Sequence, residues 1–555
     1  MVSNPAVVQT KLVKHFRQIL LWPLQLMPLR EGSQIQRHWE LLHSAGTNSP
    51  WHAVVDEFTG EPGQFQERHY NELVTFLPYV QRFLYGEGTK AEHDAAPEAG
   101  ISPMRVFRRD DVASVRLTAK PGAAPVTLSI AHIDLYFFFD IDVMLLNVET
   151  YASDLSLAVV QDVLYRFGRA YPAGWDTDGQ AVHSMHLVEW LGSDGTVLAK
   201  CDSGDRDTFL EFVGQHRVPR IGSHWKFLLQ PLVQDQSGTG GAIRYRQIEY
   251  YRMPLMGYLA LDNPRALSRA DFARLALVTG AGEADAGMLP YAEQYLQDFE
   301  QRFCYDRFWA EVGPAPNTRY LCSGHSLVVV GDAASQFYAC QDRGVLAQFR
   351  HQHFLLFLIA HFQKAALLMF SDRLVEALRA LEIGNPASVR RFKRAIRGSF
   401  EGFLRFTHRY WFHEISDQAQ VKALWHLCAR HLELDALYAE VKERIADMNS
   451  YLDADSLRRQ ANTIVRLTVV TIFGLIGTVT TGFLGMNLIA EADASPGRKI
   501  AYFIAVFVPT IVLTFYTMAK SKRLSDFLDV VSDERLSAWQ KLKAFAAIWR
   551  GRGDD

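Results

Sequence analysis

The sequence predicts an α/β domain in the cytosol, then a long stalk helix and two C-terminal transmembrane helices. Strand-like and helix-like segments alternate over residues 1–335. No glycine or proline occurs between Gly402 and Gly474, which favours one long helix. Two stretches without a charged residue, Leu467 to Ala490 and Ile500 to Ala519, each reach the about 20 residues that cross a bilayer. These three observations determine the predicted fold class.

The overall composition is that of a folded protein, with 48% hydrophobic and 21% charged residues among 555. The net charge of -3 gives no indication of a nucleic-acid partner. Five scattered cysteines without a C-x-x-C pair indicate reduced thiols and argue against a disulfide framework or a zinc ribbon. The apolar segment "QILLWPLQLMPL" has two prolines and no cleavage site, so we expect an irregular buried or surface segment rather than a signal peptide.

Residues 1–335 have the patterns of a mixed α/β domain. A strand-rich segment precedes a helix with a serine N-cap, and a hairpin is expected at Ser193-Asp194-Gly195. Further strands are predicted in "RYRQIEYYRMPLMGYLAL", as a pair, and in "HSLVVVGD". The strand-rich segment is Asp134 to Glu149, and the helix lies within Ser153 to Tyr171.

Residues 336–415 form a predicted cytosolic helical region. The apolar run "FLLFLIAHFQKAALLMF" is interrupted by His361, Gln363 and Lys364, so it is expected to be a core helix rather than a third membrane span. The next helix carries a basic run that is expected to be a solvated face or a face opposite acidic neighbours. That run contains Arg390, Arg391, Lys393, Arg394 and Arg397.

Residues 416–466 are predicted to be the stalk helix. Ser416 is a suitable N-cap, and an apolar stripe with spacings of three and four residues follows. The stripe consists of Leu434, Leu437, Val441, Ile445, Met448 and Leu452. An unbroken helix from Asp417 to the membrane would be roughly 100 Å long at about 1.5 Å per residue.

The membrane part begins with a first span at residues 467–490, followed by an external loop at 491–499 that contains Glu491 and Asp493. The second span covers residues 500–519, and residues 520–555 return to the cytosol. Basic residues flank both spans on one side, among them Lys520, Lys522 and Arg523. The positive-inside rule therefore places both flanks, and with them both termini, in the cytosol. The expected location is the inner (plasma) membrane of a bacterial cell.

The first span is rich in small residues, with four glycines and five threonines between Leu467 and Gly485. Small residues allow close helix packing in lipid, which explains them without any further function. One two-span hairpin cannot enclose a pore. A conduit would need several copies of the chain around an axis.

The residues Gly485-Met486-Asn487 stand at the end of the first of two C-terminal spans, after a long stalk helix and before a basic cluster. In this motif and its location, the C-terminal part resembles the CorA family of magnesium and divalent-cation channels. The resemblance implies a homopentamer whose first span lines the pore, and magnesium as the transported and regulatory ion, with no organic cofactor. Two departures are Leu484, where the family has tyrosine, and Ile476, where it has proline.

The resemblance implies a ring of Asn487 side chains at the outer mouth. Magnesium gives up its water reluctantly, so amide oxygens that hydrogen-bond to its hydration shell can recognise the hydrated ion. A neutral ring also avoids holding the ion too tightly for conduction. Gly485 would let the backbone turn out of the helix there.

Aligned on this motif, the family's pore face would consist of Ile464, Leu467, Thr471, Leu475, Thr478 and Gly482. The leucines and isoleucine would form apolar constrictions that gate by dewetting, and the oxygens of Thr478 and Gly482 would contact the ion. A lipid or helix contact is the alternative for the aliphatic residues. Candidate ligands for regulatory magnesium between copies are Asp447, Asp453 and Asp455, for which a solvated stalk face is the alternative.

The tail is predicted to be a basic amphipathic helix on the inner leaflet, or alternatively docked on a neighbouring stalk. Its apolar residues are Leu536, Trp539, Leu542, Phe545 and Trp549, and its basic residues are Arg535, Lys541, Lys543 and Arg550.

Three functions remain open: a magnesium channel that also accepts cobalt or nickel, a zinc transporter of the ZntB kind, and a non-conducting membrane-tethered sensor or scaffold. Enzyme functions are disfavoured. Asp140-x-Asp142 lies in a strand pattern, His351-x-His353 and the pair His408 and His413 lack a third ligand, and no phosphate-binding loop occurs. The expected partners are divalent cations, the bilayer and further copies of the chain.

Overall fold

The computed structural model describes residues 11–29, 37–44, 49–54, 67–86, 102–249, 251–281, 289, 291–379, 381–382, 385–485 and 495–532. The chain divides into two compact units, Met1–Ile445 and Ala446–Asp555. Predictions for Met486, Asn487, Glu491, Asp493 and the tail after residue 532 lie outside the described residues.

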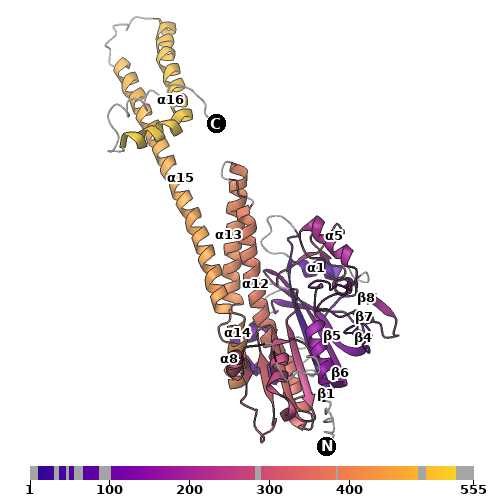
Figure 1. The fold of residues 1–555 in the computed structure, drawn as a ribbon. Helices are drawn as coiled ribbons and strands as arrows, with labels where there is room; N and C mark the ends of the chain where they lie inside the picture. Colours follow the sequence, from indigo (N-terminus) through magenta and orange to yellow (C-terminus); the bar gives the residue numbers. More distant parts are fainter. Residues whose placement is uncertain are drawn as a thin grey trace, which may run out of the picture. The chain divides into compact units, whose positions relative to one another are not determined.

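The first unit is built on one large sheet, to which fourteen strands of the described residues belong (Figure 1). Its main order is β12-β13-β14-β11-β1-β6-β5-β4-β7-β8. Most neighbours are antiparallel, while β11 and β14 pair in parallel, as do β9 and β10. The strands are β1 (Leu12–Leu26), β2 (His52–Ala53), β3 (Met104–Arg108), β4 (Ser114–Thr118), β5 (Val126–Phe138), β6 (Ile141–Ser156), β7 (Leu187–Leu191), β8 (Val197–Lys200), β9 (Val233–Gln234), β10 (Arg244–Gln247), β11 (Leu255–Leu261), β12 (Cys304–Tyr305), β13 (Arg319–Cys322) and β14 (Ser326–Asp332).

The N-terminal segment is the central strand β1, so the prediction of an irregular segment is wrong. The two prolines of that segment argued against a central strand, because proline removes a ladder hydrogen bond. The Leu21 amide donates to the Pro254 carbonyl on the β11 side, so the nitrogen of Pro23 faces the same side. There, pairing with β11 ends at Leu20 and pairing with β10 begins at Leu24. Pro23 therefore occupies a gap in which no strand needs its amide.

The strand-rich segment predicted between Asp134 and Glu149 forms two strands, β5 and β6, which pair as a hairpin. Asp140 occupies the turn with a positive φ of 69°. The predicted hairpin at Ser193-Asp194-Gly195 is confirmed by the pairing of β7 with β8. In contrast, β10 and β11 both pair with β1 rather than with each other, so that predicted strand pair is wrong.

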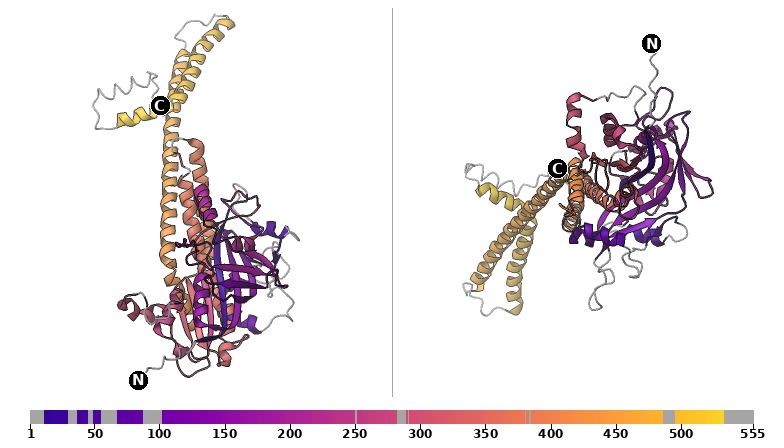
Figure 2. Two further views of the ribbon diagram at one scale, coloured as in Figure 1. Left: turned by 45° about the vertical axis from the view of Figure 1, so that its right-hand side comes forward. Right: turned by 90° about the horizontal axis from the view of Figure 1, so that it is seen from below.

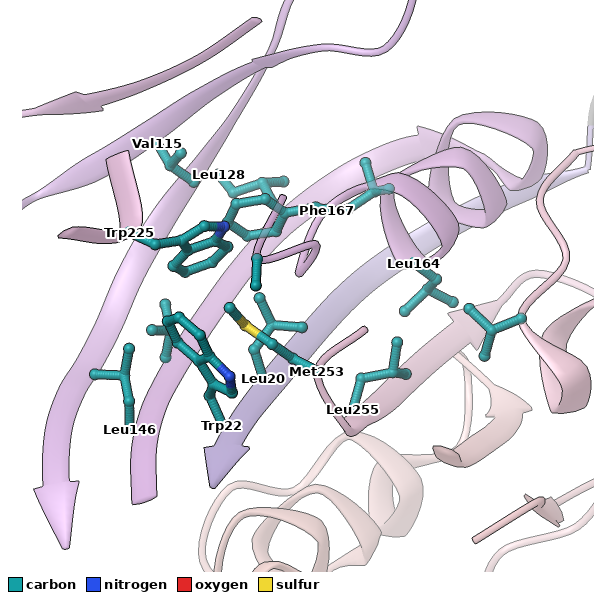
Figure 3. Close-up of a cluster of buried hydrophobic side chains, with 14 of the residues drawn as sticks. Leu20, Trp22, Val115, Leu128, Leu146, Leu164, Phe167, Trp225, Met253 and Leu255 are labelled. Carbon is teal, nitrogen blue, oxygen red and sulfur yellow. The ribbon is translucent and has the colours of Figure 1, made fainter. Parts of the chain in front are cut away.

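A hydrophobic core lies on one face of the central strands (Figure 3). Trp22 of β1 packs edge-on against Trp225 with ring centroids 6.2 Å apart, and Phe167 stacks on Trp225 at 5.5 Å. Both indole rings are almost fully buried, and the Trp225 indole donates to the Arg169 carbonyl at 2.7 Å. This large buried aromatic area anchors the sheet.

Several helices of the first unit pack on the sheet, among them α4 and α12. The predicted helix with a serine N-cap is α4, capped by Ser156. The helical segments are α1 (His38–Ser44), α2 (Glu67–Thr75), α3 (Pro78–Tyr85), α4 (Leu157–Arg166), α5 (Arg206–His216), α6 (Ser223–Leu229), η3 (Pro264–Ala266), α7 (Arg269–Leu277), α8 (Glu293–Gln297), α9 (Phe299–Phe303), α10 (Gln336–Ala339), α11 (Val345–Gln348), η4 (Phe349–His353), α12 (Phe354–Arg379), α13 (Pro386–Arg409) and α14 (Ala419–His431).

The prediction that the apolar run at residues 354–370 is a core helix is confirmed, because most of α12 is buried. Its polar residues have specific partners. His361 is hydrogen-bonded through Nε2 to the Gly324 carbonyl at 3.0 Å, and the Gln363 amide donates to the Tyr410 carbonyl at 2.9 Å. Burial and these bonds together hold α12 inside the unit.

The prediction of one helix from Asp417 onward is wrong. The helix α14 ends at His431, and Glu433 adopts a left-handed conformation with φ 55° before α15 (Leu434–Gly485) begins. The 52 residues of α15 give a length of about 78 Å at about 1.5 Å per residue. Sequence could not locate this break, because neither glycine nor proline marks it. The predicted apolar stripe begins as expected, with Leu434, Val441 and Ile445 buried.

Figure 2 shows α12, α13 and the beginning of α15 running side by side. Phe403 of α13 contacts Phe370 of α12 at 5.7 Å and Tyr438 of α15 at 5.7 Å between ring centroids. In the predicted basic run of α13, Arg391, Arg394 and Arg397 are exposed in the single chain.

Candidate functional site

The candidate site is one face of α15 in the second unit, where α15 forms a hairpin with α16 (Pro496–Ser532). Ile464, Leu467 and Leu475 are 64–67% exposed within the single chain. Thr471, Thr478 and Gly482 are exposed as well. All six predicted pore-face residues therefore lie on the surface of one chain.

The opposite face of α15 packs on α16. Val469 is only 3% exposed, and a Cβ at Gly477 would lie 2.7 Å from Cγ2 of Thr510 in α16. At about 100° per residue, Val469 and Gly477 lie on the far side of the helix from Leu475 and Gly482. The small residue at 477 thus serves close helix packing, while a Cβ at Gly482 would meet nothing within 4 Å.

The threonine hydroxyls of this face donate hydrogen bonds to backbone carbonyls of the same helix. The Thr471 hydroxyl donates to the Leu467 carbonyl and that of Thr478 donates to the Gly474 carbonyl, both at 2.9 Å. Each oxygen keeps lone pairs that can accept from water around an ion. Since α15 ends at Gly485, the Gly482 carbonyl belongs to the last four of the helix, which have no amide partner within it.

The second helix of the hairpin exposes apolar side chains in many directions. Among them, Phe503 is 60% exposed, Phe507 44% and Val512 60%. Its part Pro496–Leu513 is long and apolar enough to cross a membrane, as is the buried Val345–Arg379 of the first unit. An apolar surface of this kind marks a membrane or interaction site. These observations are compatible with a membrane protein, on the evidence of one uncovered helix.

Several predicted residues have a place in a helix but no described side chain. Ile476 and Leu484 lie in α15, and Lys520, Lys522 and Arg523 lie in α16. Gly485 is the last residue of α15.

The candidate regulatory carboxylates lie along α15, with Asp447 and Asp453 exposed and Asp455 further along the same helix. Within the described residues, no group of three or more His, Cys, Asp or Glu side chains is arranged to hold a metal ion. A magnesium site made from them would require neighbouring copies.

The motifs considered for enzymes have structural partners. Arg409 pairs with Asp140 at 2.8 Å, and Arg373 pairs with Asp142, so both aspartates join the β5–β6 hairpin to α12 and α13. His351 lies 3.3 Å from Glu72. Burial lowers the pKa of His353 to about 4, so that imidazole is neutral in the folded protein.

A buried ionic cluster, which was not predicted from the sequence, lies on the other face of the central strands. Arg17 and Arg350 both donate to Glu149, at 2.6 Å and 2.9 Å. Burial opposes ionisation of Glu149, but the two arginines overcome it and lower its pKa. The side chain of Glu149 is 5% exposed, and a charged residue at the end of a strand-like segment was the available signal in the sequence.

No protein-family model, curated protein or solved structure matches the chain.

Proposed function

We propose that the chain is a divalent-cation channel of the bacterial inner (plasma) membrane, with magnesium as its main ion. The proposal is carried by the division of α15 into two faces: one packs on α16, and the opposite one presents apolar, hydroxyl and glycine positions without a cover. A single hairpin encloses no conduit, so several copies, five by the CorA resemblance, would surround the pore.

In this assembly the exposed face of α15 lines the path of the ion. Ile464, Leu467 and Leu475 form apolar rings that block the path when they dewet. Thr471 and Thr478 offer hydroxyl oxygens between these rings. The alternation of apolar rings and oxygen positions suits an ion that passes with much of its water.

The outer mouth is assigned to Asn487, supported by the Gly485-Met486-Asn487 motif and its location at the end of the first apolar stretch. Amide oxygens recognise hydrated magnesium without adding a charge. Asp453 and Asp455 are proposed to bind regulatory magnesium where copies meet. The short loop containing Glu491 and Asp493 is placed outside the cell.

Ion flux into liposomes that carry the purified chain tests this function. Magnesium uptake is expected to exceed that of cobalt, nickel and zinc. Asn487→Ala should abolish magnesium uptake while the assembly keeps its size, because the change is small and at a water-facing mouth. Asn487→Asp should bind cations more tightly and conduct worse, since up to five charges would retain the ion.

Other results would select a different function. Zinc uptake without magnesium uptake would favour a transporter of the ZntB kind. If the protein assembles and inserts but conducts no ion, the non-conducting tethered sensor is favoured. The departures from the family pattern at Ile476 and Leu484 support that alternative. Wild-type flux in the assembled Asn487→Ala variant would remove the role of Asn487.

Topology is tested by thiol labelling of intact cells. A cysteine at Asp493 should react with an impermeant reagent, and one at Ser3 should react only after lysis. The reverse pattern would overturn the proposed orientation.

A further inference from the structure

The helix α13 has a basic outer face, with Arg391, Arg394 and Arg397 exposed. These three arginines have no ion-pair partner within the part of the chain that the structure describes. Phe392 and Ile396, on the other side of α13, are buried. The charge of this face is therefore left uncompensated by the unit to which it belongs.

The beginning of α15 has an acidic outer face. Glu443 and Asp447 are exposed and follow each other by one helical turn. Glu440 lies on the same side and pairs with Arg444, but neither Glu443 nor Asp447 has an ion-pair partner among the described residues. Val441 and Ile445 of the opposite side are buried in the first unit.

The two charged faces point away from each other in one copy. The helices α13 and α15 meet at the stacked rings of Phe403 and Tyr438. At about 100° per residue, Arg394 lies about 180° around α13 from Phe403, and Asp447 about 180° around α15 from Tyr438. An ion pair between the two faces within one chain is thus excluded by geometry.

The faces also match in height along the helices. The two helices run antiparallel, so residues before Phe403 in α13 stand beside residues after Tyr438 in α15. Arg397 is six residues from that contact and Glu443 five, which is roughly 9 Å and roughly 8 Å along the axes. A neighbouring copy related by rotation about an axis close to the helix direction would keep these heights.

We propose that the basic face of α13 in one copy docks on the acidic face of α15 in the next copy. Two different, complementary surfaces on opposite sides of one unit make a head-to-tail contact, which is the kind that closes into a ring. Charge complementarity of this kind determines register and partner choice. The inference rests on the proposed function in that it assigns a contact between the copies that would form the pore.

Charge reversal with a matched control tests the contact in the full-length protein. Arg391→Glu, Arg394→Glu and Arg397→Glu together should lower the assembled fraction at least tenfold at low salt. Glu443→Arg with Asp447→Arg should do the same, and combining both sets should restore assembly. The control, Lys120→Glu, Arg206→Glu and Arg307→Glu, changes the charge equally at exposed positions outside both faces and should leave assembly intact. Size-exclusion chromatography with light scattering measures each.

Chemical cross-linking gives a second, independent readout. A chain with Arg394→Cys and Asp447→Cys, treated with a short bismaleimide, should give a ladder of covalent multimers, because a head-to-tail contact links each copy to two others. Each single cysteine variant should give no more product than the wild type.

The contact would be ruled out if the variant with all three arginines reversed still assembles, or if the combined variant does not restore assembly. If the arginine variant assembles but no longer binds anionic vesicles, the basic face binds lipid instead. In each of these cases the wild-type protein still assembles and conducts, so the proposed function is unaffected. A wild type that neither assembles nor conducts would instead remove the proposed function.

Discussion

The helices α12 and α16 are both long and apolar enough to cross a membrane, yet their environments are opposite. The most apolar window around α12 is 83% buried inside the first unit, whereas that of α16 is 0% buried. Apolar composition alone therefore does not distinguish a core helix from a membrane span. The core helix and the candidate span differ in their polar residues and in the partners of those residues.

The polar residues of α12 decide its environment. His361 and Gln363 bond to backbone carbonyls of other segments, and Lys364 lies 3.7 Å from Glu249. Such groups are costly in lipid but are satisfied in a protein interior. The corresponding stretch of α16, Ile500 to Ala519, has no charged residue at all.

The largest effects are expected when a lysine is introduced into the apolar part of α12 or of α16, because the two variants should fail in different ways. Ile359→Lys puts an unpaired charge at a position that is 0% exposed in α12, and an isolated buried charge costs several kcal/mol. We expect this variant to lose the near-ultraviolet circular dichroism and the protease resistance of the first unit.

Val512→Lys should act on the membrane instead, because Val512 is 60% exposed in the single chain. A lysine near the centre of a span costs about 3 kcal/mol on insertion scales. The first unit should stay folded while the carbonate-resistant membrane fraction falls. An equal loss of first-unit folding in both variants would show that α16 also belongs to a protein core.

The sequence predicted local features well where one residue type enforces them. The turn at Ser193-Asp194-Gly195 and the buried strand β14 follow from glycine conformation and β-branched residues, and α12 was assigned to the core from its three polar interruptions. The contribution of Pro23 to β1 could not be predicted, because its tolerance depends on where two distant strands end.

The candidate site was predictable only as a pattern. Spacings of three and four place the pore-face residues on one stripe of α15, and the structure leaves this stripe uncovered opposite the Gly477 contact. Which glycine of the span packs on α16 depends on the position of Thr510, which is 33 residues away in sequence. Whether the stripe lines a pore depends on further copies, which neither one sequence nor one chain contains.

Two glycine substitutions in α15 should sharpen the comparison with a smaller effect. Gly477→Ala adds a Cβ that would lie 2.7 Å from Cγ2 of Thr510, whereas Gly474→Ala adds one that meets nothing within 4 Å. Crowding of this kind typically costs about 1–3 kcal/mol. The first variant should lower the thermal stability of the purified assembly, and the second should not.

The methyl group of Thr510 provides the control for that prediction. Thr510→Ser removes Cγ2 but keeps the hydroxyl that donates to the Val506 carbonyl at 2.8 Å. The double variant with Gly477→Ala should regain most of the lost stability. If it does not, the close contact between the two helices is not the cause of the loss.

The smallest expected effect is the part of the pH dependence of folding stability that is due to His361 of α12. Burial, with a further contribution from Lys364, lowers the pKa of His361 to about 3. Because the folded value lies below the unfolded value of about 6.5, only the unfolded chain binds this proton between those values, so stability falls as the pH falls from 6.5 toward 3. His361→Gln should remove up to about 2 kcal/mol of that loss between pH 7 and pH 5, at 1.36 kcal/mol per unit. Denaturant unfolding followed by near-ultraviolet circular dichroism measures the difference.

His426→Gln, exposed on α14, is the matched control and should leave the slope of stability against pH unchanged. A slope in His361→Gln equal to that of the wild type would mean that the buried imidazole is protonated in the folded chain as readily as in the unfolded one.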